Sequence, residues 1–204
     1  SRHLTRYQNS GYAADYQAFV ADVSSRLKAR NIANSDVFEK IIAEQLARLM
    51  AYKDEYEVAR LYTSPEFKAG LAAQFDGDYK LEVNLAPPLL AFRKDHKTGR
   101  PRKIAMGRWI FPAFSVLAKM KGLRGTPFDV FGMTAERRME RALITEYRDL
   151  ILELVENVTE DRLDLATQIA SAASLIAGYG VVKEEGVAAY RQQIQSLLPQ
   201  FHQG

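Results

Sequence analysis

The amino-acid sequence predicts a mainly α fold, a helical domain with a small two- or three-stranded β element inserted at about residues 79–110. Three observations predict this class. Apolar residues recur three and four positions apart along residues 12–75 and again along 113–200, the spacing of one helix face. In residues 79–85, apolar and polar side chains alternate, as in a half-buried strand. With 47% hydrophobic residues, a chain of 204 residues is long enough to bury a single core.

Three helices are expected in the first third of the chain, over residues 12–27, 36–62 and 64–75. Asp36, followed three residues later by Glu39, has the form of a capping box at the start of the second helix. Ser64 and Pro65 predict the N-cap and first residue of the third, because proline costs little where its missing N–H would have no helical partner.

The C-terminal part of the chain again predicts helices. Thr134 is expected to cap the longest helix, over residues 135–157. Thr159, followed by two acidic residues that oppose the positive end of the helix dipole, starts another. The "GYG" at residues 178–180 reads as a turn before a last helix, since no strand precedes it to complete a phosphate-binding unit.

Residues 103–111, "KIAMGRWIF", are a possible returning strand of the β element. Pro87 and Pro88 interrupt any ladder before it, because neither can donate a backbone hydrogen bond. Trp109, the only tryptophan, is expected to be a core plug at the sheet edge, with an interface anchor as the alternative.

The connection between these strands, "DHKTGRPRK" at residues 95–103, is strongly basic. We expect it to be either a solvated hairpin turn or a segment that contacts an anion through Arg100, Arg102 and Lys103. Binding of nucleic acid is not expected, because the chain's net charge is only +3 and no aromatic residue is interleaved with the basic side chains.

A second basic group lies on the predicted helix over 135–157. Its arginines gather on one side of the helix, beside two glutamates: Arg137, Arg138, Arg141 and, two turns on, Arg148. Because guanidinium groups bind carboxylate and phosphate in a bidentate manner, Arg137 and Arg141 are candidates for contacting an anion or an acidic partner. The alternative is an ion-pair network within the chain.

The acidic cluster of Asp54, Glu55 and Glu57 could in principle supply a general acid and base. With Lys53 and Arg60 nearby on the predicted helix, the favoured interpretation is a solvated, ion-paired face. We therefore predict no catalytic residue in this cluster.

The composition excludes several classes of site. The chain has no cysteine, which excludes disulfides, cysteine-bound metal clusters and a thiol nucleophile, and its three histidines lack ligand spacing. No catalytic, cofactor-binding or metal site is therefore predicted. No apolar run reaches the roughly 18 to 20 residues that span a bilayer, and the N-terminus has no signal-peptide form, so we expect a cytoplasmic protein with no membrane partner. A start without methionine suggests a piece excised from a larger chain.

Four segments resemble a known enzyme family: residues 51–62, 85–103, 122–147 and 178–184. In this order they are similar to the C-terminal region of the large fused indolepyruvate ferredoxin oxidoreductases of bacteria, in the 2-oxoacid:ferredoxin oxidoreductase superfamily. The resemblance implies a parent enzyme that oxidatively decarboxylates aryl 2-oxoacids to acyl-coenzyme A. Thiamine diphosphate, magnesium and iron–sulfur clusters would be its cofactors, coenzyme A a substrate and ferredoxin the electron acceptor.

None of that machinery carries over to residues of this chain, because the family's cluster ligands are cysteines and no diphosphate-binding "GDG…N" segment is present. The catalytic domains are therefore expected before residue 1, and residues 1–204 are a single accessory domain without oxidoreductase activity of its own.

Two functions remain open for this accessory domain. It is a structural domain that docks on the catalytic domains or on a second copy, in which case an exposed apolar patch with aromatic residues is expected. Alternatively, it is an anion-binding module whose basic residues meet the phosphates of coenzyme A or the acidic surface of ferredoxin.

Overall fold

The computed structural model describes residues 1–75, 80–85 and 104–203, and it confirms a mainly α chain with a small β element. The chain forms two compact units. Unit 1 joins Ser1–Tyr52 to Thr134–Gly204, and unit 2 is the intervening segment Lys53–Met133. The sequence predicts a single accessory domain. The structure divides it into two units, and unit 2 is inserted between the two segments of unit 1.

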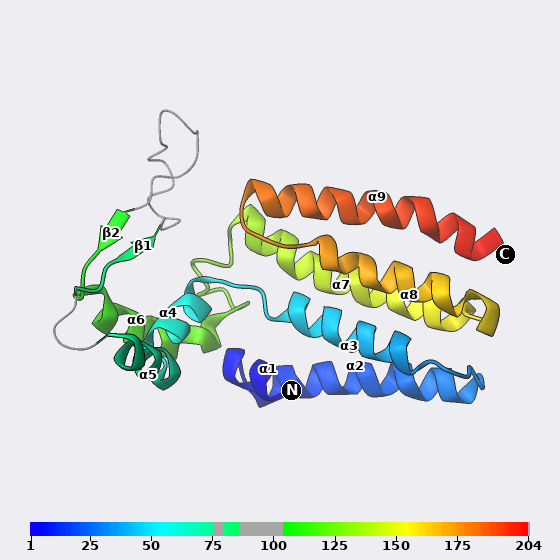
Figure 1. Ribbon diagram of the computed structural model, residues 1–204, viewed down its shortest axis with the longest axis horizontal. Coiled ribbons are helices and arrows are strands. Elements are labelled where there is room, and N and C mark those ends of the chain that lie inside the picture. The colour runs from blue at the N-terminus through cyan, green and yellow to red at the C-terminus, as the bar shows by residue number, and fades with distance from the viewer. Residues whose placement is uncertain (76–79, 86–103, 204) are drawn as a thin grey trace. The chain divides into compact units, whose positions relative to one another are not determined.

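Unit 1 consists of helices that lie side by side along their lengths (Figure 1). They are α1 (Arg2–Tyr7), α2 (Ser10–Ala29), α3 (Asp36–Met50), α7 (Ala135–Asn157), α8 (Leu163–Ser171) and α9 (Val181–Gln203). Two short 3-10 turns, Glu160–Arg162 and Ala172–Leu175, flank α8. Helix α3 packs against α2, α7 and α8, and α8 packs against α9. The predicted helices over 12–27 and 135–157 correspond to α2 and α7.

The core of unit 1 is a continuous apolar cluster contributed by all of these helices. Its fully buried members include Leu27, Phe38, Ile42, Leu46, Leu143, Ile151, Leu154, Ile169 and Phe201. They recur at helical spacing, so each helix turns one apolar face inward. Burying each such side chain contributes about 1.5–3 kcal/mol, which makes this cluster the main source of the unit's stability.

The start of α3 and its end differ from the predictions. Ser35, not Asp36, is the N-cap, and its hydroxyl donates to Glu39 Oε1 at 2.8 Å. The helix does not continue through residue 62: it ends at Met50, and a new helix begins at Glu55, whose N-cap Asp54 accepts the Glu57 N–H at 2.8 Å. The predicted caps at Ser64 and Thr134 are confirmed.

The connection into α9 confirms the turn predicted at residues 178–180. Gly178 and Gly180 have φ values of +82° and +53°, the left-handed region that favours glycine. One turn into α9, a Cβ on Gly186 would lie 2.5 Å from the Leu175 carbonyl oxygen. Only glycine therefore lets α9 pass so close to the preceding turn.

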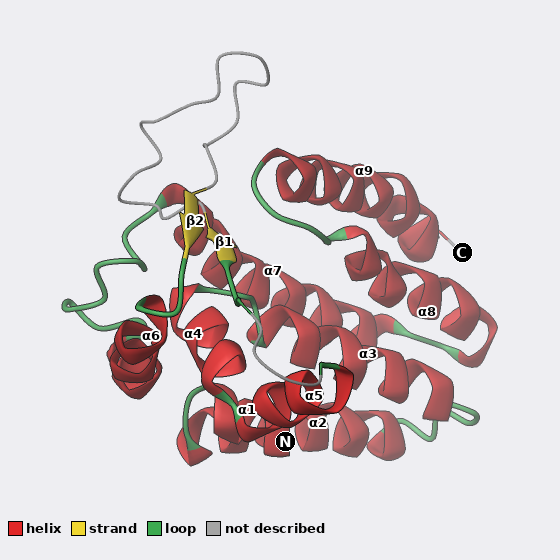
Figure 2. Cartoon of the chain, turned by 60° about the vertical axis from the view of Figure 1, so that its left-hand side comes forward, coloured by secondary structure: helices red, strands yellow, loops and turns green. Residues whose placement is uncertain are grey.

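Unit 2 contains helices α4 (Glu55–Thr63), α5 (Pro65–Gln74) and α6 (Ile110–Lys119), strands β1 (Val83–Leu85) and β2 (Ile104–Met106), and a 3-10 turn, Met120–Leu123. Helix α4 packs against both α5 and α6. The strands pair antiparallel and lie side by side in Figure 2, with Asn84 opposite Ala105. The strand predicted over 79–85 is thus described for its last three residues.

The returning strand predicted over residues 103–111 is wrong beyond Met106, because α6 begins at Ile110. Pro112 stands in the first turn of α6, where a missing N–H has no cost. Residues 76–79 and 86–103 lie outside the described residues, and with them the basic connection carrying Arg100, Arg102 and Lys103 and the prolines at 87 and 88.

Candidate functional site

The first candidate is the arginine row on α7, and the structure places Arg137 inside unit 1 rather than on its surface. Its guanidinium forms an ion pair with Glu140 one turn on and lies 5.9 Å from the centre of the Tyr52 ring. Arg148 pairs with Asp15 of α2 at 2.6 Å. For Arg137 and Arg148, the structure therefore agrees with the alternative prediction, ion pairs within the chain. Arg141 lies half-buried on the same helix.

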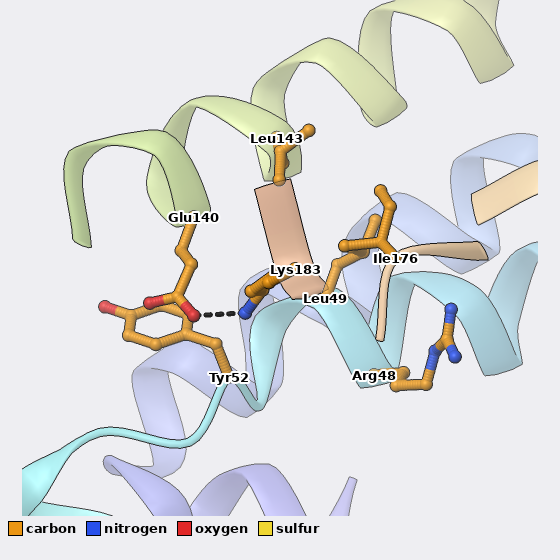
Figure 3. A pocket seen from close by; sticks show the side chains of 7 residues that line it. All are labelled: Arg48, Leu49, Tyr52, Glu140, Leu143, Ile176 and Lys183. Atoms are coloured by element: carbon orange, nitrogen blue, oxygen red, sulfur yellow. Dashed lines mark hydrogen bonds and ion pairs between the residues drawn. The ribbon is translucent and has the colours of Figure 1, made fainter. Parts of the chain in front are cut away.

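Glu140, the partner of Arg137, also contacts Lys183, and Figure 3 shows this second contact. The Glu140 side chain is 2% exposed and accepts from both Arg137 and Lys183 of α9, a group that we call the Glu140 cluster. Two cations thus share one buried carboxylate, and the contact with Lys183 joins α7 to α9. Lys183 was not predicted, because nothing in the sequence relates it to a glutamate 43 residues away.

A small pocket opens beside this cluster (Figure 3). It is lined by Arg48, Leu49, Tyr52, Glu140, Leu143, Ile176 and Lys183 and has a volume of about 40 Å³. Arg48 donates to the carbonyls of Ala173 and Ser174, and burial lowers the pKa of its guanidinium. The pocket has room for about one water molecule, so it suits an internal bridge and not an organic ligand.

The second candidate is the group of buried charges in unit 2. Arg124 donates to both oxygens of Asp54, at 2.5 and 2.9 Å, and both side chains are 3% exposed. Tyr56 donates to Asp129 at 3.1 Å, and burial, reinforced by this carboxylate, raises the pKa of Tyr56. Glu57 is buried too and pairs with Arg60 at 2.6 Å.

The acidic cluster predicted at residues 54–57 is therefore ion-paired, as expected, but the prediction that it is solvated is wrong for Asp54 and Glu57. The reason is that the partner of Asp54 comes from 70 residues away and encloses it. Each of these charges has a strong partner within unit 2, which is the arrangement of a structural network.

The third candidate is Trp109, whose predicted role as a core plug is wrong. Its side chain is 68% exposed at the N-cap of α6, while the buried face of the helix is formed by Ile110 and Phe114. Val116 and Met120 are also exposed, at 61% and 39%. At 3.6 residues per turn, these two positions lie within about 20° of Trp109 around the helix axis. We call Trp109, Val116 and Met120 the apolar stripe.

The exposed residues next to the apolar stripe are mixed: Arg108, Ser115 and Lys119 are polar, and two others are apolar. Pro112 and Ala113, which lie between its members, are exposed. Unit 2 exposes further large apolar side chains, namely Phe75, Phe128, Val130 and Met133. A lone exposed apolar residue is normal on a soluble protein, but several on one helix face indicate a contact surface.

The ranges 1–75, 80–85 and 104–203 contain no group of three or more histidine, aspartate or glutamate residues placed to hold a metal ion. Among the helices in these ranges, none has the length and apolar character needed to cross a membrane.

Residues 1–196 match the sequence model of a family described as a family of unknown function (DUF6537). The chain therefore belongs to this family. No curated protein and no solved structure matches the chain. Because the family carries no stated activity, a function has to be argued from the residues themselves.

Proposed function

We propose that this member of the DUF6537 family is the C-terminal accessory domain of a 2-oxoacid ferredoxin oxidoreductase of the indolepyruvate type. The resemblance of residues 51–62, 85–103, 122–147 and 178–184 to that family supports the identity of the parent enzyme, because the four segments keep their order along nearly the whole chain. The parent would act in the cytoplasm, and its thiamine diphosphate, magnesium and iron–sulfur clusters would be held by its catalytic domains. The accessory domain would dock on those domains and stabilise the assembled enzyme.

The observation that carries the docking role is the apolar stripe on α6. A structural role requires an exposed apolar surface with an aromatic residue, and Trp109 provides one at the end of the stripe. Tryptophan is enriched among the residues that dominate binding energy at interfaces, where its large ring is desolvated on contact. Val116 and Met120 extend the same surface by three turns, as expected for a helix face that packs against a partner.

An anion-binding module is the alternative proposal. In it, the phosphates of coenzyme A or the acidic surface of ferredoxin would be met by Arg100, Arg102 and Lys103. Arg137 is a weak candidate for this role, because it is buried and already paired with Glu140. Replacing Arg100, Arg102 and Lys103 by alanine in the full-length enzyme separates the proposals: a rise in the apparent KM for coenzyme A or for ferredoxin favours the anion-binding module.

The docking proposal is tested by one substitution at two positions of equal exposure. Val116 in the stripe and Val37 on α3 are 61% and 63% exposed. In the full-length enzyme, Val116→Lys is expected to detach this region, measured as faster cleavage within it by a protease and reduced turnover. Val37→Lys is expected to change neither. Equal effects of the two variants would contradict docking through α6, and turnover of indolepyruvate by residues 1–204 alone would contradict the accessory role.

A further inference from the structure

Unit 2 holds a second, larger pocket that is separate from the apolar stripe. It is lined by Tyr62, Phe67, Lys68, Leu71, Leu81, Arg108 and Phe111, and its volume is about 450 Å³. Sites for organic ligands occupy about 300–1,000 Å³ and are mostly apolar with a few polar groups. The pocket therefore has the size and composition of a ligand site, in contrast to the water-sized pocket beside Glu140.

The walls of this pocket are aromatic and held in place by ring contacts. Tyr62 meets Phe67 edge to face, with ring centres 5.1 Å apart, and stacks on Phe114 at 5.8 Å. Phe111 meets Phe114 edge to face, with ring centres 6.1 Å apart. Helix α5 has no buried residue, so Phe67 and Leu71 present a half-buried face to the pocket. A flat ring entering here would complete the packing of that face.

The polar groups at the rim are two cations. Lys68 on α5 and Arg108 before α6 are both exposed, and no carboxylate is among the lining residues in the part of the chain that the structure describes. Among the described residues, neither cationic side chain has an ion-pair partner. Since they project from two different elements, both can approach one anion, the guanidinium in a bidentate manner.

We propose that this pocket binds a small aromatic anion, a planar ring system that carries one carboxylate or phosphate. The ring lies among Tyr62, Phe67 and Phe111, and the charged group meets Lys68 and Arg108 at the rim. The proposal does not rest on the docking role, because a ligand can occupy this pocket whether or not the chain belongs to an oxidoreductase.

Three probes with the same 2-substituted naphthalene ring test the class of ligand on the complete 204-residue chain: 2-naphthoate, 2-naphthyl phosphate and the neutral 2-naphthalenemethanol. Titration calorimetry is expected to show that at least one of the two anions binds about fivefold more tightly than the alcohol. A preference for the phosphate or for the carboxylate identifies which of the two anionic groups the rim accepts. Absence of binding by all three, or equal binding of anions and alcohol, would overturn the proposal.

Variants then test the site. Arg108→Gln is expected to weaken the preferred anion about fivefold and to leave the alcohol unchanged, while Lys119→Gln, an exposed cation of the same unit outside the pocket, changes neither. Leu71→Trp fills the pocket and is expected to abolish binding of all three probes. Because Arg108 is exposed, its variant folds even if Leu71→Trp does not. Equal effects of Arg108→Gln and Lys119→Gln would also overturn the site.

Discussion

The two units of this chain reach stability by different means. Unit 1 buries a continuous apolar core drawn from six helices. Unit 1 encloses one group of charges, the Glu140 cluster. Unit 2 buries far fewer apolar side chains, among them Ala59, Val83, Ile110 and Phe114, and relies more on buried charges: Asp54, Glu57, Arg124 and Asp129. Several of its large apolar side chains, including Trp109, remain exposed.

The difference indicates where the function lies. Unit 1 has the larger core, but it also exposes large apolar side chains, namely Val37 and, around the turn into α9, Leu175, Tyr179, Val181 and Val182. The pocket described in unit 1 has room for about one water molecule. A unit that leaves an apolar stripe and an aromatic pocket open has surface still to be covered. We therefore expect unit 1 to act as a scaffold and unit 2 to make the contacts.

The largest effect is expected where unit 2 depends on a buried pair. Arg124→Ala leaves the Asp54 carboxylate buried without its bidentate partner, so unfolding of unit 2 should become easier by about 3–5 kcal/mol. Hydrogen exchange of residues 53–75 measures this. Lys80→Ala, which removes an exposed ion pair with Glu82 of the same unit at an N···O distance of 2.7 Å, serves as the control and should leave this exchange unchanged. If Arg124→Ala lowers the free energy of unfolding by less than about 1 kcal/mol, as for a surface ion pair, the stability of unit 2 does not depend on its buried charges.

In unit 1, the largest loss of stability is expected from a substitution in the apolar core. Leu154→Ala creates a cavity at a fully buried position and is expected to destabilise the unit by about 2–5 kcal/mol in chemical denaturation. The same type of truncation at an exposed position, Val116→Ala, should change stability by about 0.5 kcal/mol or less. If the two truncations cost the same, the core would not be the source of stability.

Alkaline pH should weaken unit 1 through its buried tyrosines. Burial raises the pKa of Tyr147 and of Tyr190 above the ordinary value of 10.0. The unfolded chain therefore loses these protons first, so the stability is fully present below about pH 10 and falls as pH rises further. For Tyr147 the loss approaches about 1.4 kcal/mol per pH unit. The part of the tyrosinate absorbance that Tyr147→Phe removes should rise together with unfolding, and this variant should reduce the slope of stability against pH. Ionisation well before unfolding would contradict the burial.

The smallest effect on stability is expected at Trp109. Because its side chain is mostly exposed, Trp109→Ala should change the free energy of unfolding by about 0.5 kcal/mol or less. Its fluorescence, the only tryptophan signal of the chain, should be strongly quenched by acrylamide. A large loss of stability, or fluorescence that acrylamide does not quench, would show that the Trp109 side chain is buried.

The sequence predicts the elements better than the contacts between them. Ser64 and Thr134 could be recognised as caps because the signal is local, and the same locality explains the one-residue error between Ser35 and Asp36, since either residue type can cap. Trp109 was misplaced because a short apolar run fits a strand and a helix equally well.

The ion pairs could not be predicted from spacing. Arg124 meets Asp54 across 70 residues and Lys183 meets Glu140 across 43, and only the folded chain brings them together. The aromatic pocket has the same origin, because its lining residues come from α4, α5, α6 and the segments on either side of the strands. Local patterns determine helices, whereas sites require the packing of several elements.

The most direct test of the docking role is amide hydrogen exchange of α6, compared between residues 1–204 alone and the full-length enzyme. If α6 docks on the catalytic domains, peptides covering residues 109–120 should exchange more slowly in the full-length enzyme, while peptides covering Val37 on α3 should exchange equally in both. Equal exchange of residues 109–120 in the two proteins would contradict the account.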